Sequence, residues 1–202
     1  TVSPAHQSAG IGRQLLDSAL AYGAACRAWI ILSSDDPRAL RRYARAGFEL
    51  LPAVGAVGRV RSPLPTEGHV RVGSPEDIEL CATASRFVRG AAHTRDIPAL
   101  ISVGSKLWVC EDRRGVGFAT AREGTPSIVA ATSAPVAADL LRTALSDAPP
   151  DGEITVESVT HAQQWAIAVL LDAGLSLVGT GAVFLKGDVG PMAPYLPSGA
   201  YL

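Results

Sequence analysis

The sequence predicts a protein of the α/β (α+β) class, because helical and strand patterns alternate along its 202 residues. A glycine-containing loop at residues 7–13 runs directly into a helical pattern, followed by a strand, a second helix and further strands. Short sequence matches then return about 126 residues later, which is typical of one structural unit present twice. A hairpin pattern at residues 106–121 adds antiparallel strands.

The first helix is predicted to begin at the end of the loop, because apolar residues recur at the three-and-four spacing of one helix face. These residues are Ile11, Leu15, Leu16, Ala19 and Leu20. No proline interrupts the pattern before it ends near Tyr22 and Gly23. Residues 26–33 then predict a short buried strand.

A second helix is predicted to begin at Asp35 or Asp36, since an aspartate cap followed by Pro37 is a strong start signal. It runs through Tyr43 and stops at Gly47. Alternating apolar residues over 48–60, interrupted by proline and glycine, predict two strands and a turn.

The loop has the features of an anion site. Gly10 and Gly12 allow the backbone to approach a ligand closely, and the first amides of the following helix have no intrahelical acceptor. Such an arrangement suits phosphate. Glycines before a helix also serve ordinary turns, so the loop alone leaves both interpretations open.

Together with the segment that follows, the loop resembles the acetyl-CoA loop of the GNAT superfamily of N-acetyltransferases, which has the form Gln/Arg-x-x-Gly-x-Gly/Ala. The matching residues are Gln7-Ser8-Ala9-Gly10-Ile11-Gly12, preceded by Val2-Ser3-Pro4 where the family has a strand ending Val-x-Pro or similar. Residues 36–48 are similar to the family's segment Asn-x-x-Ala-x-x-x-Tyr-x-x-x-Gly-Phe. Asp36 stands where asparagine is usual, which weakens one cofactor contact.

The resemblance implies tandem GNAT-like folds with mixed, mostly antiparallel central sheets flanked by helices. It implies an acetyl-CoA-dependent acyltransferase that moves an acetyl group to an amine by direct attack in a ternary complex. Tyr43 would be the catalytic proton donor to the leaving CoA thiolate. The cofactor-binding residues implied are Val2, Gln7, Ser8, Ala9, Gly10, Ile11, Gly12, Arg13 and Asp36.

Other interpretations remain open at this point. A lone tyrosine such as Tyr43 is more often a half-buried core aromatic than an acid. If Tyr43 is not an acid, the chain is a non-catalytic acetyl-CoA-binding or scaffold protein, or a purely structural or interaction module. An amine-dependent release of CoA separates these alternatives, because a sensor binds the cofactor without turnover.

The internal repeat predicts two copies of the unit. Residues 15–20 match residues 140–145, residues 46–50 match residues 173–177, and residues 55–57 match residues 181–183. We therefore expect residues 1–61 to be the C-terminal half of an acetyl-CoA-binding GNAT domain, followed by a linker at 62–67. Residues 68–187 form a second GNAT-like domain, and residues 188–202 form a proline-rich tail.

The second copy has further elements at its own start. A strand is predicted at residues 69–72, and Ser74-Pro75-Glu76-Asp77 opens a helix. Its inner face is expected to use Ile78, Cys81, Ala82 and Phe87. A helical stretch at 97–101 and strands at 106–111, 115–121 and 127–131 follow.

The repeat also predicts that the second copy is chemically degenerate. The offsets carry Gly10 to Pro135, Gly12 to Ala137 and Tyr43 to Leu170. Proline removes an amide donor from the loop, and leucine cannot reprotonate a thiolate. The second copy is thus expected to serve packing or substrate shaping.

We expect the C-terminal tail to dock, because three prolines forbid a helix or a central strand while its tyrosines and leucines are too apolar for a free tail. A position across the junction of the two copies or near the acceptor cleft would satisfy this expectation. A whole first domain needs further residues before Thr1, which in the family help to form the acceptor site. Exposed sheet edges then favour a homodimer or a partner fragment that completes the first domain.

Composition sets the remaining expectations. A net charge of −1 with 48% hydrophobic residues predicts a soluble cytoplasmic protein with no nucleic-acid partner and no membrane span. The resemblance implies that its partner is a small-molecule or peptide amine. The four histidines form no ligand motif, so no metal is expected, and the three cysteines are interpreted as buried, reduced thiols. The abundance of alanine and arginine suggests a bacterial source. An arginine-rich helix face is interpreted mainly as a solvated surface, although it is also suited to CoA phosphates. Its residues are Arg38, Arg41, Arg42 and Arg45.

Overall fold

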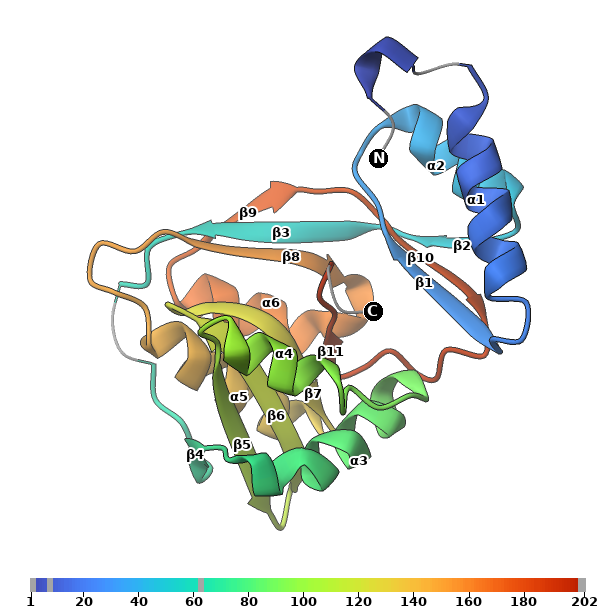
Figure 1. The fold of residues 1–202 in the computed structure, drawn as a ribbon. Helices are drawn as coiled ribbons and strands as arrows, with labels where there is room; N and C mark the ends of the chain where they lie inside the picture. Colours follow the sequence, from blue (N-terminus) through green and yellow to red (C-terminus); the bar gives the residue numbers. More distant parts are fainter. Residues whose placement is uncertain (1–2, 7–8, 62–63, 200–202) are drawn as a thin grey trace.

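The computed structural model describes residues 3–6, 9–61 and 64–199 (Figure 1). The elements in chain order, with η for a 3₁₀ helix, are η1 (Pro4–His6), α1 (Ile11–Tyr22), β1 (Ala28–Leu32), α2 (Pro37–Arg45), β2 (Glu49–Leu51), β3 (Ala53–Gly58), β4 (Val70–Val72), η2 (Pro75–Asp77), α3 (Ile78–Arg89), α4 (Asp96–Ser102), β5 (Lys106–Asp112), β6 (Gly115–Arg122), β7 (Thr125–Ala131), α5 (Ala134–Ser146), β8 (Ile154–Thr160), η3 (His161–Gln163), α6 (Gln164–Asp172), β9 (Ser176–Gly179), β10 (Val183–Gly187) and β11 (Tyr195–Leu196). The described strands pair antiparallel and are flanked by helices, which confirms the expected fold class.

The two N-terminal helices begin and end where the sequence predicts. Gly10 caps α1 in the left-handed conformation (φ 81°), and Gly23 follows its last residue. Asp36 caps α2, its carboxylate accepting the amide of Arg38 at 2.8 Å, with a proline at the first helical position. The carboxylate of Asp36 thus provides an acceptor for a backbone amide that has none within the first turn of the helix.

The strands of the N-terminal part differ from the prediction in one respect. β1 is half-buried along its whole length rather than fully buried. Pro52 separates β2 from β3, whereas Gly55 lies inside β3. β2 and β3 do not pair with each other, because each joins a different sheet.

The predicted elements of the second part are confirmed with small shifts in their bounds. Ser74 and Asp77 form a capping box at η2, from which α3 continues. Cys81 and Ala82 are buried on α3, but Phe87 is 48% exposed, so its expected core position is wrong. Ser85 and Val88 complete the buried face instead, because they follow Cys81 at the three-and-four spacing of one helix face, whereas Phe87 lies on another side of the helix. β5 and β6 form the expected hairpin.

The sheets interleave strands from distant parts of the chain (Figure 1). A five-stranded sheet has the order β11-β7-β6-β5-β4. One three-stranded sheet has the order β1-β10-β2, so the late strand β10 lies between two early strands. The other has the order β8-β3-β9, so the early strand β3 lies between two late ones. The exchange is reciprocal, and each small sheet needs residues from both parts of the chain.

Alternation along the strands divides the interior into separate cores. In β7, Val129 and Ala131 face α5, whereas Ile128 and Ala130 face α3 and α4. β10 behaves in the same way, since Val183 and Leu185 belong to the core of α3 while Phe184 lies on the opposite side. The side of Phe184 is a small third core under α1 and α2. Its members are Phe48, Ala182 and Phe184, with Leu20, Trp29, Ile31, Leu40, Tyr43 and Ala46 packed against them.

The C-terminal tail is docked, as its apolar residues predict. β11 adds to the edge of the five-stranded sheet, with Tyr195 opposite Ala130. Tyr195 is fully buried, and its hydroxyl lies 2.9 Å from Nε2 of His93. The Oε1 atom of Gln163 accepts a hydrogen bond from the amide of Tyr195 at 3.1 Å, and its Nε2 atom donates one to the carbonyl of Met192 at 2.6 Å. The tail therefore connects the five-stranded sheet to the segment that precedes α6.

The cysteines are all free, but they do not share one environment. Cys81 and Cys110 are buried, and burial raises the pKa of the Cys81 thiol to about 12. Burial also raises the pKa of Cys110. Cys26 is exposed, so its expected burial is wrong; it lies in the turn before β1 rather than in the strand.

Candidate cofactor site

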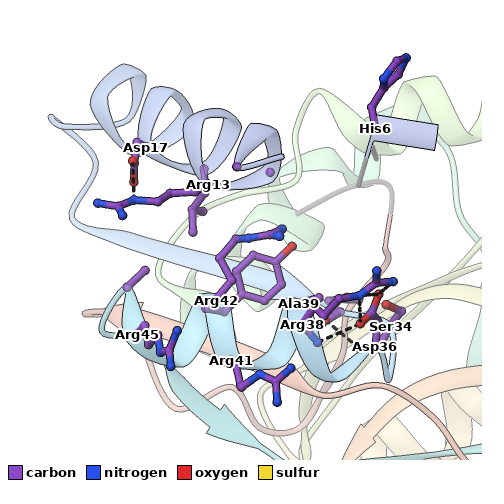
Figure 2. A pocket seen from close by; sticks show the side chains of 17 residues that line it. His6, Arg13, Asp17, Ser34, Asp36, Arg38, Ala39, Arg41, Arg42 and Arg45 are labelled. Carbon is purple, nitrogen blue, oxygen red and sulfur yellow. Dashed lines mark hydrogen bonds and ion pairs between the residues drawn. The ribbon is translucent and has the colours of Figure 1, made fainter. Parts of the chain in front are cut away.

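A pocket of about 980 Å³ opens between the N-terminal loop, α1, the end of β1 and α2 (Figure 2). Its lining residues are His6, Gly10, Gly12, Arg13, Leu16, Asp17, Leu32, Ser33, Ser34, Asp36, Arg38, Ala39, Arg41, Arg42, Tyr43, Arg45 and Ala46. The wall thus combines the glycine loop, the expected proton donor and the arginine-rich face of α2. A volume of this size is at the upper end of the range typical of small-molecule sites.

The loop leaves backbone donors available at the start of α1. Gly10 adopts a left-handed conformation that side chains disfavour, with no heavy atom within 4 Å of the place a Cβ would take. The amides of Ile11 and Gly12 have no hydrogen-bond acceptor among residues 3–6, 9–61 and 64–199. The amide of Arg13, by contrast, donates to the carbonyl of Gly10 at 3.0 Å. Two amides and the positive end of the helix therefore face any bound anion.

Tyr43 is held in the pocket wall by aromatic packing. Its ring lies edge-on to Phe184, with centroids 5.2 Å apart, and to Phe48 at 6.3 Å. Phe184 belongs to β10, so a strand from near the C-terminal end of the chain supports the expected catalytic residue. The hydroxyl of Tyr43 has no hydrogen-bond partner among the described residues.

Asp36 is occupied by structural contacts rather than free for a ligand. Arg38 donates to its carboxylate through Nε at 3.0 Å and through Nη2 at 2.7 Å. Hydrogen bonds from the side chain and the amide of Arg38 lower the pKa of Asp36 to about 2. This carboxylate is therefore ionised at neutral pH and serves as the cap of α2.

The arginine face of α2 is not simply a solvated surface. All four of its arginines line the pocket, and Arg38, Arg41 and Arg45 are exposed, so the face is both solvated, as expected for most of it, and part of the pocket wall. The two pocket aspartates are each paired, Asp17 with Arg13 at 3.6 Å and Asp36 with Arg38 at 2.7 Å. Arg41, Arg42 and Arg45 have no acidic partner within the described ranges. The pocket thus carries a surplus of positive charge that suits a phosphorylated ligand.

The structure brings together some of the predicted site residues and leaves others apart. Gly10, Gly12, Arg13, Asp36 and Tyr43 line the pocket. Ala9 and Ile11 do not line it, although Ile11 is the first residue of α1. Val2, Gln7 and Ser8 lie outside the described residues. His6 lines the outer rim, and Figure 2 shows its ring directed away from the arginines of α2.

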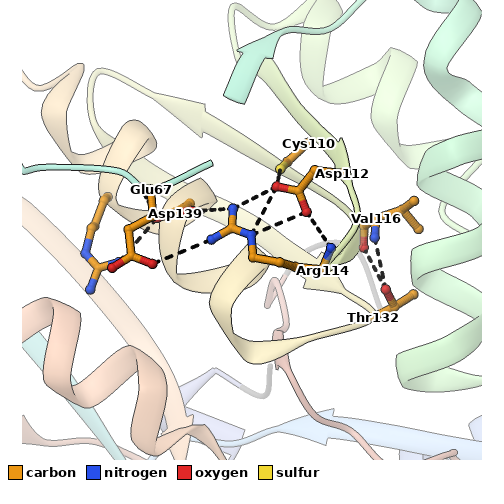
Figure 3. A network of polar contacts seen from close by, with 8 residues as sticks. Glu67, Cys110, Asp112, Arg114, Val116, Thr132 and Asp139 are labelled. Atoms are coloured by element: carbon orange, nitrogen blue, oxygen red, sulfur yellow. Dashed lines mark hydrogen bonds and ion pairs between the residues drawn. The ribbon is translucent and has the colours of Figure 1, made fainter. Parts of the chain in front are cut away.

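The sequence offsets carry two of the site positions to residues in the core of the second half of the chain. Ala137, opposite to Gly12 in the repeat, and Leu170, opposite to Tyr43, are fully buried in the core around α5. The buried carboxylate of Asp139 on α5 accepts Nη2 of Arg114 at 2.8 Å and the amide of Glu67 at 3.2 Å (Figure 3). Arg114 also donates to Asp112 at 2.8 Å. Protein groups therefore pair with the one carboxylate of α5, whereas Arg41, Arg42 and Arg45 beside α1 have no acidic partner among the described residues.

Within 3–6, 9–61 and 64–199, no group of three or more histidine, cysteine, aspartate or glutamate side chains is placed to hold a metal ion. In the same ranges, no helix is long and apolar enough to cross a membrane.

Solved structures resemble this chain throughout its length. A structure from Pyrococcus horikoshii named as an acetyltransferase aligns over 99% of this chain and 68% of its own, with 18% identity and a TM-score of 0.75.

The fold is that of GNAT acetyltransferases.

Two other structures with this fold are GCN5-related N-acetyltransferases. The one from Kribbella flavida aligns over 93% of this chain and 50% of its own, with 17% identity and a TM-score of 0.54. The one from Sphaerobacter thermophilus aligns over 93% of this chain and 71% of its own, with 15% identity and a TM-score of 0.52. Residues 1–48 also match the family model described as Acetyltransferase (GNAT) family. No curated protein matches the sequence.

The sequence leaves two contributions to this site unassigned. Phe184 supports Tyr43 from a strand more than a hundred residues away, and no local pattern announces that contact. The guanidinium of Arg42 lies beside Gly12, where a Cβ would be 2.5 Å from its Nη1. The spacing of the arginines on α2 was the only indication of this contact in the sequence.

Proposed function

We propose that this protein is an N-acetyltransferase that transfers the acetyl group of acetyl-CoA to an amine by direct attack in a ternary complex. The observation that carries the proposal is the convergence of Gly10, Gly12 and Tyr43 on one pocket. The GNAT fold and the family-model match over residues 1–48 support it, because the match covers both the loop and the tyrosine.

The chain supplies each part of the proposed reaction from a separate element. The amides at the start of α1 hold the diphosphate of CoA, and the segment around Val2 aligns the pantetheine arm. The amine attacks the thioester carbonyl, the C–S bond breaks, and the CoA thiolate takes a proton from the hydroxyl of Tyr43. The nitrogen of the new amide loses one proton to water, and a proton from water restores the hydroxyl of Tyr43. A positioned acid contributes roughly 10²- to 10⁴-fold to the rate of such a step. The acceptor, a small molecule or a peptide, binds on the side of the thioester away from the loop.

In this proposal the two halves of the chain have different roles. The second half, with Leu170 in place of the tyrosine, is a degenerate GNAT-like unit that supports the first. Its strand β10 carries Phe184 into contact with Tyr43. β1 lies at the edge of its sheet, which leaves room for a homodimer partner or a partner fragment.

The test is an assay of CoA release from acetyl-CoA in the presence of a panel of amines. We expect amine-dependent release together with saturable binding of acetyl-CoA. Binding without release by any amine would replace the enzyme with a non-catalytic acetyl-CoA-binding or scaffold protein. Absence of binding would leave only a structural or interaction module.

A further inference from the structure

The two ends of α2 are held in different ways. Its start is fixed within the helix itself, by the cap that Asp36 provides. Its last turn carries Tyr43, whose ring packs against Phe184 of β10 and against Phe48. None of the nine residues of α2 is fully buried. The position of the last turn therefore depends on its contacts with β10 and with the turn that follows the helix.

Lys186 of β10 braces the turn that follows Tyr43. Its Nζ atom donates a hydrogen bond to the carbonyl of Ala46 at 2.7 Å and lies 5.5 Å from the centre of the Phe48 ring. Both of these residues are bonded to Tyr43, because the amides of Ala46 and Phe48 each donate to its carbonyl at 3.1 Å. Between them lies Gly47, in the left-handed conformation (φ 81°). One ammonium group thus contacts both sides of the turn at Gly47.

The contact of Lys186 is suited to the end of a helix. Its ammonium has no acidic partner within 3–6, 9–61 and 64–199, and it donates to a carbonyl instead. The last carbonyls of a helix have no intrahelical donor and lie at the negative end of the helix dipole, so a cation there is favourable. Phe184 stands two residues earlier on β10 and therefore on the same face of the strand. One strand face thus holds both the ring of Tyr43 and the turn after it.

We propose that Lys186 is a positioning residue for the hydroxyl of Tyr43, so that proton transfer in the pocket depends on strand β10 from the second half of the chain. This inference rests on the proposed function, in which that hydroxyl protonates the CoA thiolate. Lys186 does not line the pocket, and it acts through the turn without touching a reacting atom. Loss of its ammonium displaces the last turn of α2, whereas the cap at Asp36 and the loop before α1 keep their contacts.

The experiment measures CoA release by the full chain in the wild type and in Lys186→Met, with the amine that the wild type uses best. Methionine keeps an unbranched apolar side chain beside Phe48 but removes the donor. We expect kcat to fall roughly 10- to 100-fold, since a displacement of about 1 Å at a reacting group can cost a factor of that order. The KM for acetyl-CoA should change by less than about threefold. Lys186→Arg should recover most of the loss, because arginine also donates to carbonyls at a helix end.

A double-mutant cycle with Tyr43→Phe distinguishes positioning of the hydroxyl from general support of the fold. If Lys186 acts through that hydroxyl, Lys186→Met has nothing left to misplace once the hydroxyl is gone. We therefore expect Lys186→Met to change the kcat of Tyr43→Phe by less than about twofold. Losses of equal size in the two backgrounds would overturn the inference and leave the proposed function intact.

Lys106→Met is the matched control, because Lys106 is the other lysine of the sequence and has similar contacts. Its Nζ atom donates to the carboxylate of Asp147 at 2.6 Å and lies 5.9 Å from the centre of the Trp108 ring. Lys106 lies outside the pocket lining, so this variant should keep the wild-type kcat. An equal fall of kcat in Lys106→Met and Lys186→Met would overturn the positioning role. A wild type that releases no CoA with any amine would overturn the proposed function as well.

Discussion

The replacement Tyr43→Phe isolates the hydroxyl that the proposed mechanism uses. The ring keeps its edge-on contacts with Phe184 at 5.2 Å and Phe48 at 6.3 Å, each worth about 0.5–1.5 kcal/mol beyond burial. The hydroxyl has no hydrogen-bond partner among the described residues, so its removal leaves no orphaned group. We expect the free energy of unfolding to change by less than about 1 kcal/mol.

Catalysis should respond far more strongly than stability. Loss of the proton donor is expected to lower kcat by roughly 10²- to 10⁴-fold, which corresponds to about 3–5 kcal/mol of activation free energy. The affinity for acetyl-CoA should stay within about threefold, since the hydroxyl acts on the leaving thiolate and not on the nucleotide. The assay is CoA release at saturating acetyl-CoA and amine, combined with a binding titration.

The matched control is Tyr22→Phe, because Tyr22 is 97% exposed at the end of α1 and lies outside the pocket lining. This variant should keep wild-type turnover. Full activity in Tyr43→Phe would remove Tyr43 from the mechanism, and a parallel loss of acetyl-CoA binding would show that the residue is structural.

Two further predictions concern the docked tail. Tyr195→Phe leaves the ring in place but removes the hydroxyl that lies 2.9 Å from Nε2 of buried His93, so we expect a loss of about 1–3 kcal/mol in chemical denaturation; an unchanged midpoint would contradict that bond. Burial, followed by repulsion from Arg89, lowers the pKa of His93 below 6.5, while Asp96 opposes the shift. The unfolded chain therefore binds the proton more readily, so the contribution of His93 is complete above its unfolded pKa and is lost as the pH falls below about 6.5. The melting temperature should drop between about pH 7 and pH 5 in the wild type and less in His93→Gln. The pKa values of Asp36 and Asp77 are lowered to about 2, so these carboxylates affect the melting temperature only at lower pH.

The elements of this protein that local signals specify were predictable from the sequence. The start of α2 follows from Asp36 and Pro37, and the capping box of α3 follows from Ser74 and Asp77, because each signal satisfies backbone groups within one turn. The hairpin of β5 and β6 likewise depends on neighbouring residues.

The interleaving of the sheets was not predictable in the same way. The pairing of β10 with β1 joins Ala28 to Gly187, and nothing in either segment states its partner. Patterns of burial identify a strand and its faces, but they do not choose among strands of similar apolarity in a repeated sequence. The support of Tyr43 by Phe184 is a consequence of that choice and was therefore missed.

The surroundings of surface residues were also beyond what the sequence specifies. The spacing of the arginines on α2 gave a correct helix face, but the position of α1 beside it decides whether that face meets water or a pocket. Phe87 is apolar and is nevertheless 48% exposed, because it lies off the three-and-four spacing of Cys81, Ser85 and Val88 that forms the buried face of α3.

The most direct test of the central claim is a calorimetric titration of acetyl-CoA into the wild type and into Gly10→Asp. Gly10 has a φ of 81°, which strains any side chain but aspartate less than most, and open space around it, so an aspartate meets no neighbour and places a negative charge beside the diphosphate. Gly104→Asp is the matched control, since Gly104 has a φ of 94° and lies in the loop after α4, outside the pocket lining. We predict one bound ligand per chain in the wild type and in Gly104→Asp, and a loss of at least about tenfold in Gly10→Asp. Equal affinities in all three proteins, or no binding to the wild type, would contradict the assignment of this pocket to acetyl-CoA.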